Sequence, residues 1–258
     1  MIKLYLKYLK VNIDIWLNYF FDFIFLMLSS LFNLFSSIFI VIVLFDNTSE
    51  IGGWGKFEVL FLLGFIYGVR SVFNTFFINI IGLSDLIRSG EFDLFLTRPI
   101  SPFFQVFTSE RYNTEFPIDE LLASVLLIAI SSKHLECSIN WLYYILFIGI
   151  STIVNISINT ILGSLSFWLI KFDSAFSIKE GFDSVSEYPL SIYPKSIRLL
   201  MYTIIPVALT SYFPVKIILG KEILAREYII SLFIFLILIL LARFIWKYGI
   251  INYKSPNS

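Results

Sequence analysis

Residues 228–246 read Tyr-Ile-Ile-Ser-Leu-Phe-Ile-Phe-Leu-Ile-Leu-Ile-Leu-Leu-Ala-Arg-Phe-Ile-Trp, with Arg243 as the one charged side chain. A helix that crosses about 30 Å of hydrocarbon needs roughly 20 mainly apolar residues, so this stretch predicts a transmembrane helix. The whole chain agrees, because 58% of its 258 residues are hydrophobic and 15% are charged. A soluble domain is typically about 45–50% apolar and about 25% charged. The composition therefore indicates an integral membrane protein.

Outward from this stretch, five more apolar segments precede it in the chain. They cover residues 19–45, 57–81, 116–132, 141–170 and 197–220, and Pro206 and Pro214 break the last of them. Proline disrupts a helix around it, and broken helices in membranes often border transport pathways. A simple kinked span is the alternative. We expect an all-α integral membrane protein with six spans in a single domain, 1–258.

Basic residues set the expected orientation. They stand at both ends of the set of spans, as Lys3, Lys7 and Lys10 before the first and Arg243, Lys247 and Lys254 at the last. Short cytoplasmic loops hold the excess of Lys and Arg, so both termini are expected in the cytoplasm, which requires an even number of crossings. Residues 1–18 alternate leucines with these lysines and predict an amphipathic helix in the cytoplasmic interface; a frayed polar tail is the alternative.

Several kinds of chemistry have no residues to support them. The formal net charge is zero, so no basic field indicates nucleic acid. Cys137 and His134 are the single cysteine and histidine, too few for a disulfide or a zinc site. The sequence lacks a P-loop, an H-E-x-x-H motif and a G-x-S-x-G elbow. We therefore expect no catalytic, cofactor-binding or metal-binding residues in this chain.

One charge falls near the centre of a predicted span. Arg70 shares a helical face with Tyr67 and Asn74 by i, i+3 and i+4 spacing. A charge there costs about 2.5–3.5 kcal/mol on insertion scales, so it needs a partner or a wet cavity. Either the three residues line a translocation path, or Arg70 makes a structural pair with Asp22 or Glu58 or snorkels toward the interface. A second polar stripe recurs along the fourth span and predicts helix packing more than substrate contact; it comprises Ser151, Asn155, Asn159 and Gly163.

The first long loop, 82–102, reads Gly-Leu-Ser-Asp-Leu-Ile-Arg-Ser-Gly-Glu-Phe-Asp-Leu-Phe-Leu-Thr-Arg-Pro-Ile-Ser-Pro. Its apolar and charged positions predict a short helix along the membrane surface, broken at Gly90 and ended by Pro99. A charged helix between two spans offers a binding surface for a cytoplasmic partner. An ordinary solvated loop is the alternative.

Two sets of residues carry a family resemblance. The run Gly90-Glu-Phe-Asp-Leu-Phe-Leu-Thr-Arg-Pro99 matches the pattern G-x-[LF]-D-x-x-L-x-R-P of type-two ABC export permeases. A second set resembles that family's proline-rich run near the fifth span, namely Tyr188-Pro-Leu-Ser-Ile-Tyr-Pro194, Ile205-Pro206, Ser211-Tyr212-Phe213-Pro214 and Leu219-Gly220. The resemblance extends to span count, order and loop position.

The resemblance implies the membrane half of an ATP-driven exporter, not itself an enzyme, in a bacterial inner membrane. Two permeases, identical or related, would sit on a dimer of separate cytoplasmic ATPases that bind ATP and Mg²⁺. Loop 82–102 would dock on the ATPase, with Glu91, Asp93 and Arg98 as contact or structural charges and with Gly90 and Pro99 shaping the backbone. The broken segment would include Pro206, Tyr212 and Pro214.

Two other hypotheses stay open. One is an accessory membrane subunit or silent half-permease, and the other is an intramembrane enzyme acting on lipid, for which no catalytic pair is found. The transported substrate, and the choice between homodimer and heterodimer, do not follow from the sequence.

Overall fold

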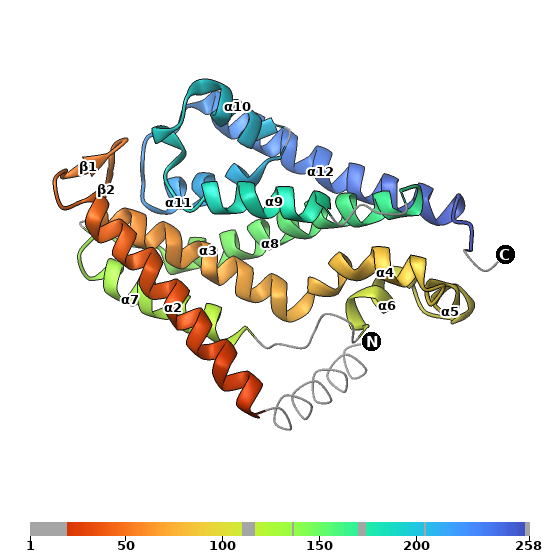
Figure 1. Ribbon diagram of the computed structural model, residues 1–258. Coiled ribbons are helices and arrows are strands. Elements are labelled where there is room, and N and C mark those ends of the chain that lie inside the picture. The colour runs from red at the N-terminus through yellow and green to blue at the C-terminus, as the bar shows by residue number, and fades with distance from the viewer. Residues whose placement is uncertain (1–19, 110–116, 136, 170–173, 204, 256–258) are drawn as a thin grey trace.

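The computed structural model describes residues 20–109, 117–135, 137–169, 174–203 and 205–255. The expected interfacial helix at 1–18 lies outside these residues. The described chain is almost entirely helical (Figure 1). Its longer helices are α2 (Phe20–Leu44), α3 (Lys56–Phe76), α7 (Ile118–Ser132), α8 (Trp141–Ser164), α9 (Ser174–Val185), α10 (Lys195–Thr203) and α12 (Ala225–Ile251). Shorter elements connect them, namely β1 (Glu50–Ile51), β2 (Trp54–Gly55), η1 (Ile78–Gly82), α4 (Leu83–Arg88), α5 (Phe92–Thr97), α6 (Pro102–Thr108), η2 (Leu165–Phe167), η3 (Leu190–Ile192), η4 (Val207–Leu209) and α11 (Tyr212–Ile218).

Four of the described helices are long and apolar enough to cross a membrane: α2, α3, α8 with its η2 extension, and α12. A fifth candidate is the pair formed by α10 and the η4–α11 segment, which bends by 76°. This break confirms the expected interruption of 197–220. Helix α7 has 15 residues, or about 22 Å at 1.5 Å per residue, which is short for a span. The six-span count therefore stays a prediction.

Helix α3 forms the centre of the bundle. In its apolar window 67% of the residues are buried, against 12% in α2 and 22% in α12, which leaves the last two on the periphery. Helix α7 packs closely against α3 at Gly64, where a Cβ would lie 2.8 Å from Ile128 Cγ1 and 3.2 Å from its backbone nitrogen. Small residues allow membrane helices to approach in this way. Phe61, Phe65 and Leu127 fill the core around this contact.

The segment 174–221 departs from the expected topology. Phe176 and Ile81, just beyond the end of α3, line one cavity, whereas a Cβ on Gly52, in the hairpin before α3, would lie 2.5 Å from Ser191 Oγ. Residues 174–192 therefore run the length of α3. The segment 195–221 then returns to its starting end, because Lys221 Nζ donates to the carbonyl oxygen of Gly53 at 2.8 Å.

The bent α10–α11 pair therefore starts and ends beside the β1–β2 hairpin, a course that favours a re-entrant segment over the single crossing expected at 197–220. In Figure 1, α9 lies beside the long helices, and α11 and the β1–β2 hairpin lie at the end opposite α4, α5 and α6. Hydropathy did not predict that residues 174–192 run along α3, because α9 carries charged residues that lower its apolar content.

Candidate functional site

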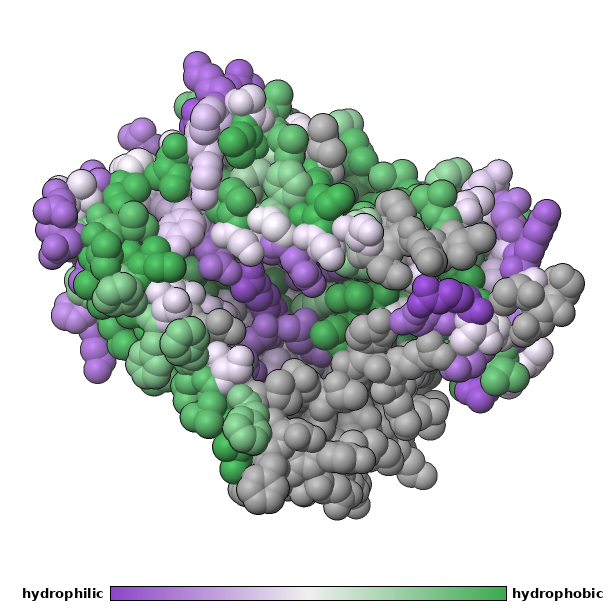
Figure 2. All heavy atoms as spheres, in the orientation of Figure 1, coloured by the Kyte–Doolittle hydropathy of each residue, from purple (hydrophilic) through white to green (hydrophobic). Residues whose placement is uncertain are grey.

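A polar cavity of about 290 Å³ lies between α3, α7, α8 and α9. Its walls carry side chains of both charges, several amides and two aromatic rings. The lining residues are Arg70, Phe73, Asn74, Ile81, Glu120, Asn155, Asn159, Phe176, Lys179, Glu180, Asp183 and Ser184. Figure 2 shows hydrophilic side chains gathered at the middle of this face, between hydrophobic regions. A hydrophilic recess flanked by apolar surface suits a polar path through a membrane protein.

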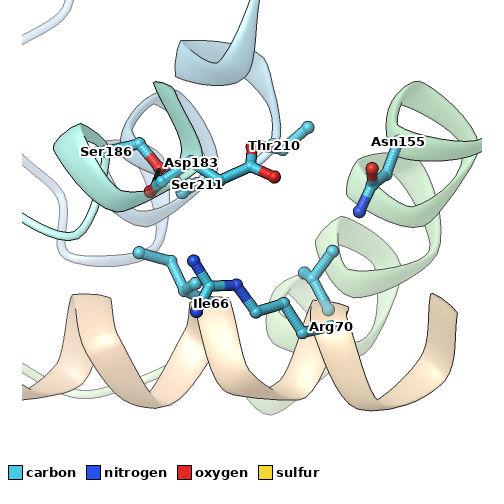
Figure 3. A pocket seen from close by; sticks show the side chains of 8 residues that line it. Ile66, Arg70, Asn155, Asp183, Ser186, Thr210 and Ser211 are labelled. Carbon is cyan, nitrogen blue, oxygen red and sulfur yellow. Dashed lines mark hydrogen bonds between the residues drawn. The ribbon is translucent and has the colours of Figure 1, made fainter. Parts of the chain in front are cut away.

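Arg70 is the central charge of the cavity. Its Nη1 lies 3.0 Å from Glu187 Oε1, in the turn after α9. Figure 3 shows Arg70 and Asp183 in a smaller adjoining pocket, with Asn155 on the opposite wall. The expected pairing of Arg70 with Glu58 is wrong, because Glu58 instead pairs with Lys221 at 2.7 Å. The side chain of Asp22, the other expected partner, lies outside the described residues.

Asn74 and Tyr67, which were predicted to share a helical face with Arg70, point to different surroundings. Asn74 lines the cavity, and its Nδ2 donates to both carboxylate oxygens of Glu120 at 3.0 Å. The Tyr67 hydroxyl instead lies 3.4 Å from Ser37 Oγ on α2, while its ring packs 5.9 Å from the Arg70 guanidinium. The structure therefore brings Arg70 and Asn74 together at the cavity and directs the tip of Tyr67 away from it.

Other cavity residues were not among the sequence-predicted site residues. Lys179 pairs with Asp183 at 2.6 Å, one turn apart on α9, and Asn159 Nδ2 donates to the Asn155 side chain at 2.7 Å. The i, i+4 spacing of Lys179, Asp183 and Glu187 could have indicated a helix with one charged face. This helix was not predicted, because a charge-rich segment between apolar stretches resembles a solvated loop.

A second set of predicted site residues lies at the far end of the bundle, from α4 to α6. Gly90 has φ +75, a conformation that glycine adopts without steric cost, and it separates α4 from α5 as expected. Helix α5 ends at Thr97, and Arg98 takes the extended conformation that a following proline favours. The predicted break at Gly90 and end before Pro99 are confirmed.

The α5 helix has an anchored side and an exposed side. Phe92 is fully buried, and its ring packs edge-on against Phe167, Trp246 and Tyr253. Ser255 Oγ donates to Asp93 Oδ2 at 2.6 Å. Burial raises the pKa of Tyr253 to about 12, and the nearby Asp93 carboxylate adds to the rise.

Glu91, Arg98 and Pro99 are exposed, and so are Leu94 (55%) and Leu96 (41%). The structure thus separates the three predicted charges, because Asp93 ties the loop to the C-terminal segment while Glu91 and Arg98 face outward.

The predicted broken segment lies at the opposite end. Pro206, Tyr212 and Pro214 are all buried, and the Tyr212 ring lies 5.3 Å from that of Trp54 in the β1–β2 hairpin. Pro214 falls in the first turn of α11, where its missing N–H removes no helical hydrogen bond. The prolines therefore shape a re-entrant turn against the hairpin.

Within the described residues, no group of three or more His, Cys, Asp or Glu side chains is placed to hold a metal ion. The chemistry of the cavity is that of charged pairs and amides, which bind and orient polar groups.

Comparison with known proteins places the chain in a family. The family model of the ABC-2 family transporter proteins matches residues 31–257, nearly the whole chain. No curated protein is similar enough to this chain to count as a relative. Members of the matched family are membrane components of transporters and work with an ABC ATPase partner. Together with the apolar helices, the match shows that this multi-pass membrane protein belongs to the ABC-2 family of transporter proteins.

Proposed function

We propose that the chain is the membrane-spanning permease subunit of an ATP-driven exporter in a bacterial inner membrane. It pairs with a second permease, either a copy of itself or a related chain. A dimer of separate cytoplasmic ATPases binds ATP and Mg²⁺ and drives the cycle. Both termini lie in the cytoplasm, so the end that carries α4, α5 and α6 faces the ATPase.

The observation that carries this proposal is the two-sided α5 helix. A docking element must present side chains to its partner and must also be fixed to the helices that it moves. Exposed Leu94, Leu96 and Arg98 meet the first requirement. Phe92 meets the second through its contacts with the ends of α8–η2 and α12. An ordinary solvated loop would not bury a phenylalanine completely.

The polar cavity supports a transport role for the same chain. Arg70, Asn74 and Asn155 offer charges and amides at the middle of the bundle, where the hydrocarbon of the bilayer would otherwise exclude polar cargo. The re-entrant segment stands at the opposite end from α5, in the position of an outer gate. We propose that cargo passes along the face of α3 and α9 between these two ends.

A silent half-permease is the second candidate, and one observation favours it. Arg70 pairs with Glu187 and Lys179 pairs with Asp183, so much of the charge in the cavity is neutralised internally. In a silent half these pairs are structural and their removal leaves transport unchanged. In an active half the same substitutions impair transport by the assembled complex.

The test is a gentle-detergent purification of the tagged chain from its native membrane, followed by mass spectrometry and an ATP-hydrolysis assay. A P-loop ATPase and a second permease are expected in the same complex. Charge reversals at the exposed positions, E91K with R98E, are expected to remove most of the ATPase. K133E, an exposed charge at the other end, serves as the control. An ATPase-free preparation that persists after mild crosslinking would overturn the proposal.

A further inference from the structure

A separate groove of about 270 Å³ opens between α8 and α12, away from the polar cavity. Its walls are almost wholly apolar, with one cation at the edge. The lining residues are Phe103, Ile156, Ser157, Thr160, Ile239, Ala242, Arg243 and Trp246. On both α12 and α8 these residues fall in the C-terminal half of the helix. The groove therefore lies toward the end of the bundle that carries α4, α5 and α6.

Helix α12 fixes the depth of this groove in the membrane. Its 27 residues extend about 40 Å at 1.5 Å per residue, which exceeds the hydrocarbon thickness of about 30 Å. The exposed rings of Phe244, Tyr248 and Trp168 stack in a row beside it, with centroids 6.0 Å and 5.8 Å apart. Tyrosine and tryptophan concentrate at the membrane–water interface. The row therefore indicates an interface close to Arg243, with the groove just inside the hydrocarbon.

Two cations stand at the mouth of the groove. Arg243 lines it, and Lys247 follows one turn later on the same helix face. Both side chains are exposed, and no carboxylate in the described part of the chain pairs with either of them. An exposed pair of cations above an apolar recess is complementary to an anionic headgroup with an acyl chain beneath it.

A polar group in the wall adds to this complementarity. Thr160 is 2% exposed, and its hydroxyl has no hydrogen-bond partner among the described residues. A buried hydroxyl without a partner is costly, and the ester carbonyl of a lipid entering the groove offers an acceptor.

We infer that the groove between α8 and α12 binds one anionic phospholipid from the cytoplasmic leaflet, with its phosphate at Arg243 and Lys247 and an acyl chain between the helices. The occupant touches Trp246 and Phe103, whose rings pack 5.0 Å apart in the aromatic cluster that also holds Phe92. The lipid thus braces the attachment of the α5 helix to α12. The choice of the cytoplasmic leaflet rests on the proposed orientation, whereas the lipid site itself rests on the groove and holds whether or not the chain exports a cargo.

The test is native mass spectrometry of the purified full chain after exchange into an equimolar mixture of phosphatidylglycerol and phosphatidylcholine. Wild-type protein is expected to retain one phosphatidylglycerol in preference to phosphatidylcholine. Each lost cation is expected to weaken retention about fivefold, and R243Q with K247Q about thirtyfold. R243K keeps the charge and is expected to keep the preference, and R226Q, at the other end of α12, is expected to behave as wild type.

Three outcomes would overturn the inference. Equal retention of the two lipids, or unchanged retention in the double variant, would show that Arg243 and Lys247 do not select a headgroup. Displacement of the lipid by excess inorganic phosphate would show a free-anion site. An intermolecular disulfide from Ile239→Cys, in a Cys137→Ser background, would show that a second copy covers the groove.

Discussion

Arg70 Nη1 and Glu187 Oε1 lie 3.0 Å apart, which joins the middle of α3 to the turn after α9. The pair is half-buried, with side-chain exposures of 27% and 20%. It connects residues that belong to different predicted segments, a span and a loop. The contact therefore holds the charged helix α9 alongside the core helix of the bundle.

Removal of one partner is expected to destabilise the protein more than removal of both. R70Q or E187Q leaves a charge in a half-buried site without its partner, at a cost of about 1–3 kcal/mol after allowance for partial exposure. At about 2–4 °C per kcal/mol for a chain of this size, this corresponds to a fall in Tm of about 2–12 °C. The double variant R70Q/E187Q is expected to regain part of the loss, as measured by thermal unfolding in detergent. Strictly additive losses would show that the two side chains do not interact.

The close contact of α3 with α7 makes Gly64 sensitive to side-chain size. G64A is expected to push Ile128 aside, because its Cβ would lie 2.8 Å from that side chain and 3.2 Å from its backbone nitrogen. Overpacking of this kind costs about 1–3 kcal/mol and lowers Tm by several degrees. Gly149 on α8 has nothing within 4 Å of a Cβ, so G149A is the matched control. Equal Tm values for the two variants would contradict the packing described for α3 and α7.

The link between Asp93 and Ser255 is expected to keep the α5 helix in place. D93A removes a charge-assisted hydrogen bond, worth about 1.5–3 kcal/mol when shielded from water. Amide hydrogen exchange over residues 91–98 is expected to accelerate while the ATPase still co-purifies, because Glu91 and Arg98 remain. K254Q, an exposed change in the same segment, is the control. Unchanged exchange in D93A would show that Phe92 alone anchors the loop.

The re-entrant course of 195–221 gives a topology prediction. A cysteine at Leu199, in a Cys137→Ser background, is expected to react with an impermeant maleimide added outside intact cells. Leu199 is exposed, and its segment starts and ends at the β1–β2 hairpin, which lies outside in the proposed orientation. A cysteine at Leu94 is expected to react only after the cells are permeabilised. If Leu199→Cys reacted only after the cells were permeabilised, the result would instead support the single crossing expected over 197–220.

Apolar length and local backbone chemistry made part of this structure predictable. Helices α2, α3, α8 and α12 fall where the apolar runs place them, and the break at Gly90 follows from its freedom to adopt positive φ. The partner of Arg70 was not predictable, because Glu187 is remote in sequence and belongs to a segment that hydropathy scores as a loop. The burial of Phe92 likewise depends on rings from α12 and η2 that no local pattern connects to it.

The central claim, that the α5 helix is the docking surface for an ATPase, is tested most directly by photo-crosslinking in native membranes. A benzoylphenylalanine placed at Leu94 is expected to crosslink to a P-loop ATPase, identified by mass spectrometry. The same group at Leu199, exposed at the opposite end of the bundle, is expected to capture none. Crosslinking of Leu94 to lipid alone, or capture of the ATPase from Leu199, would contradict the account.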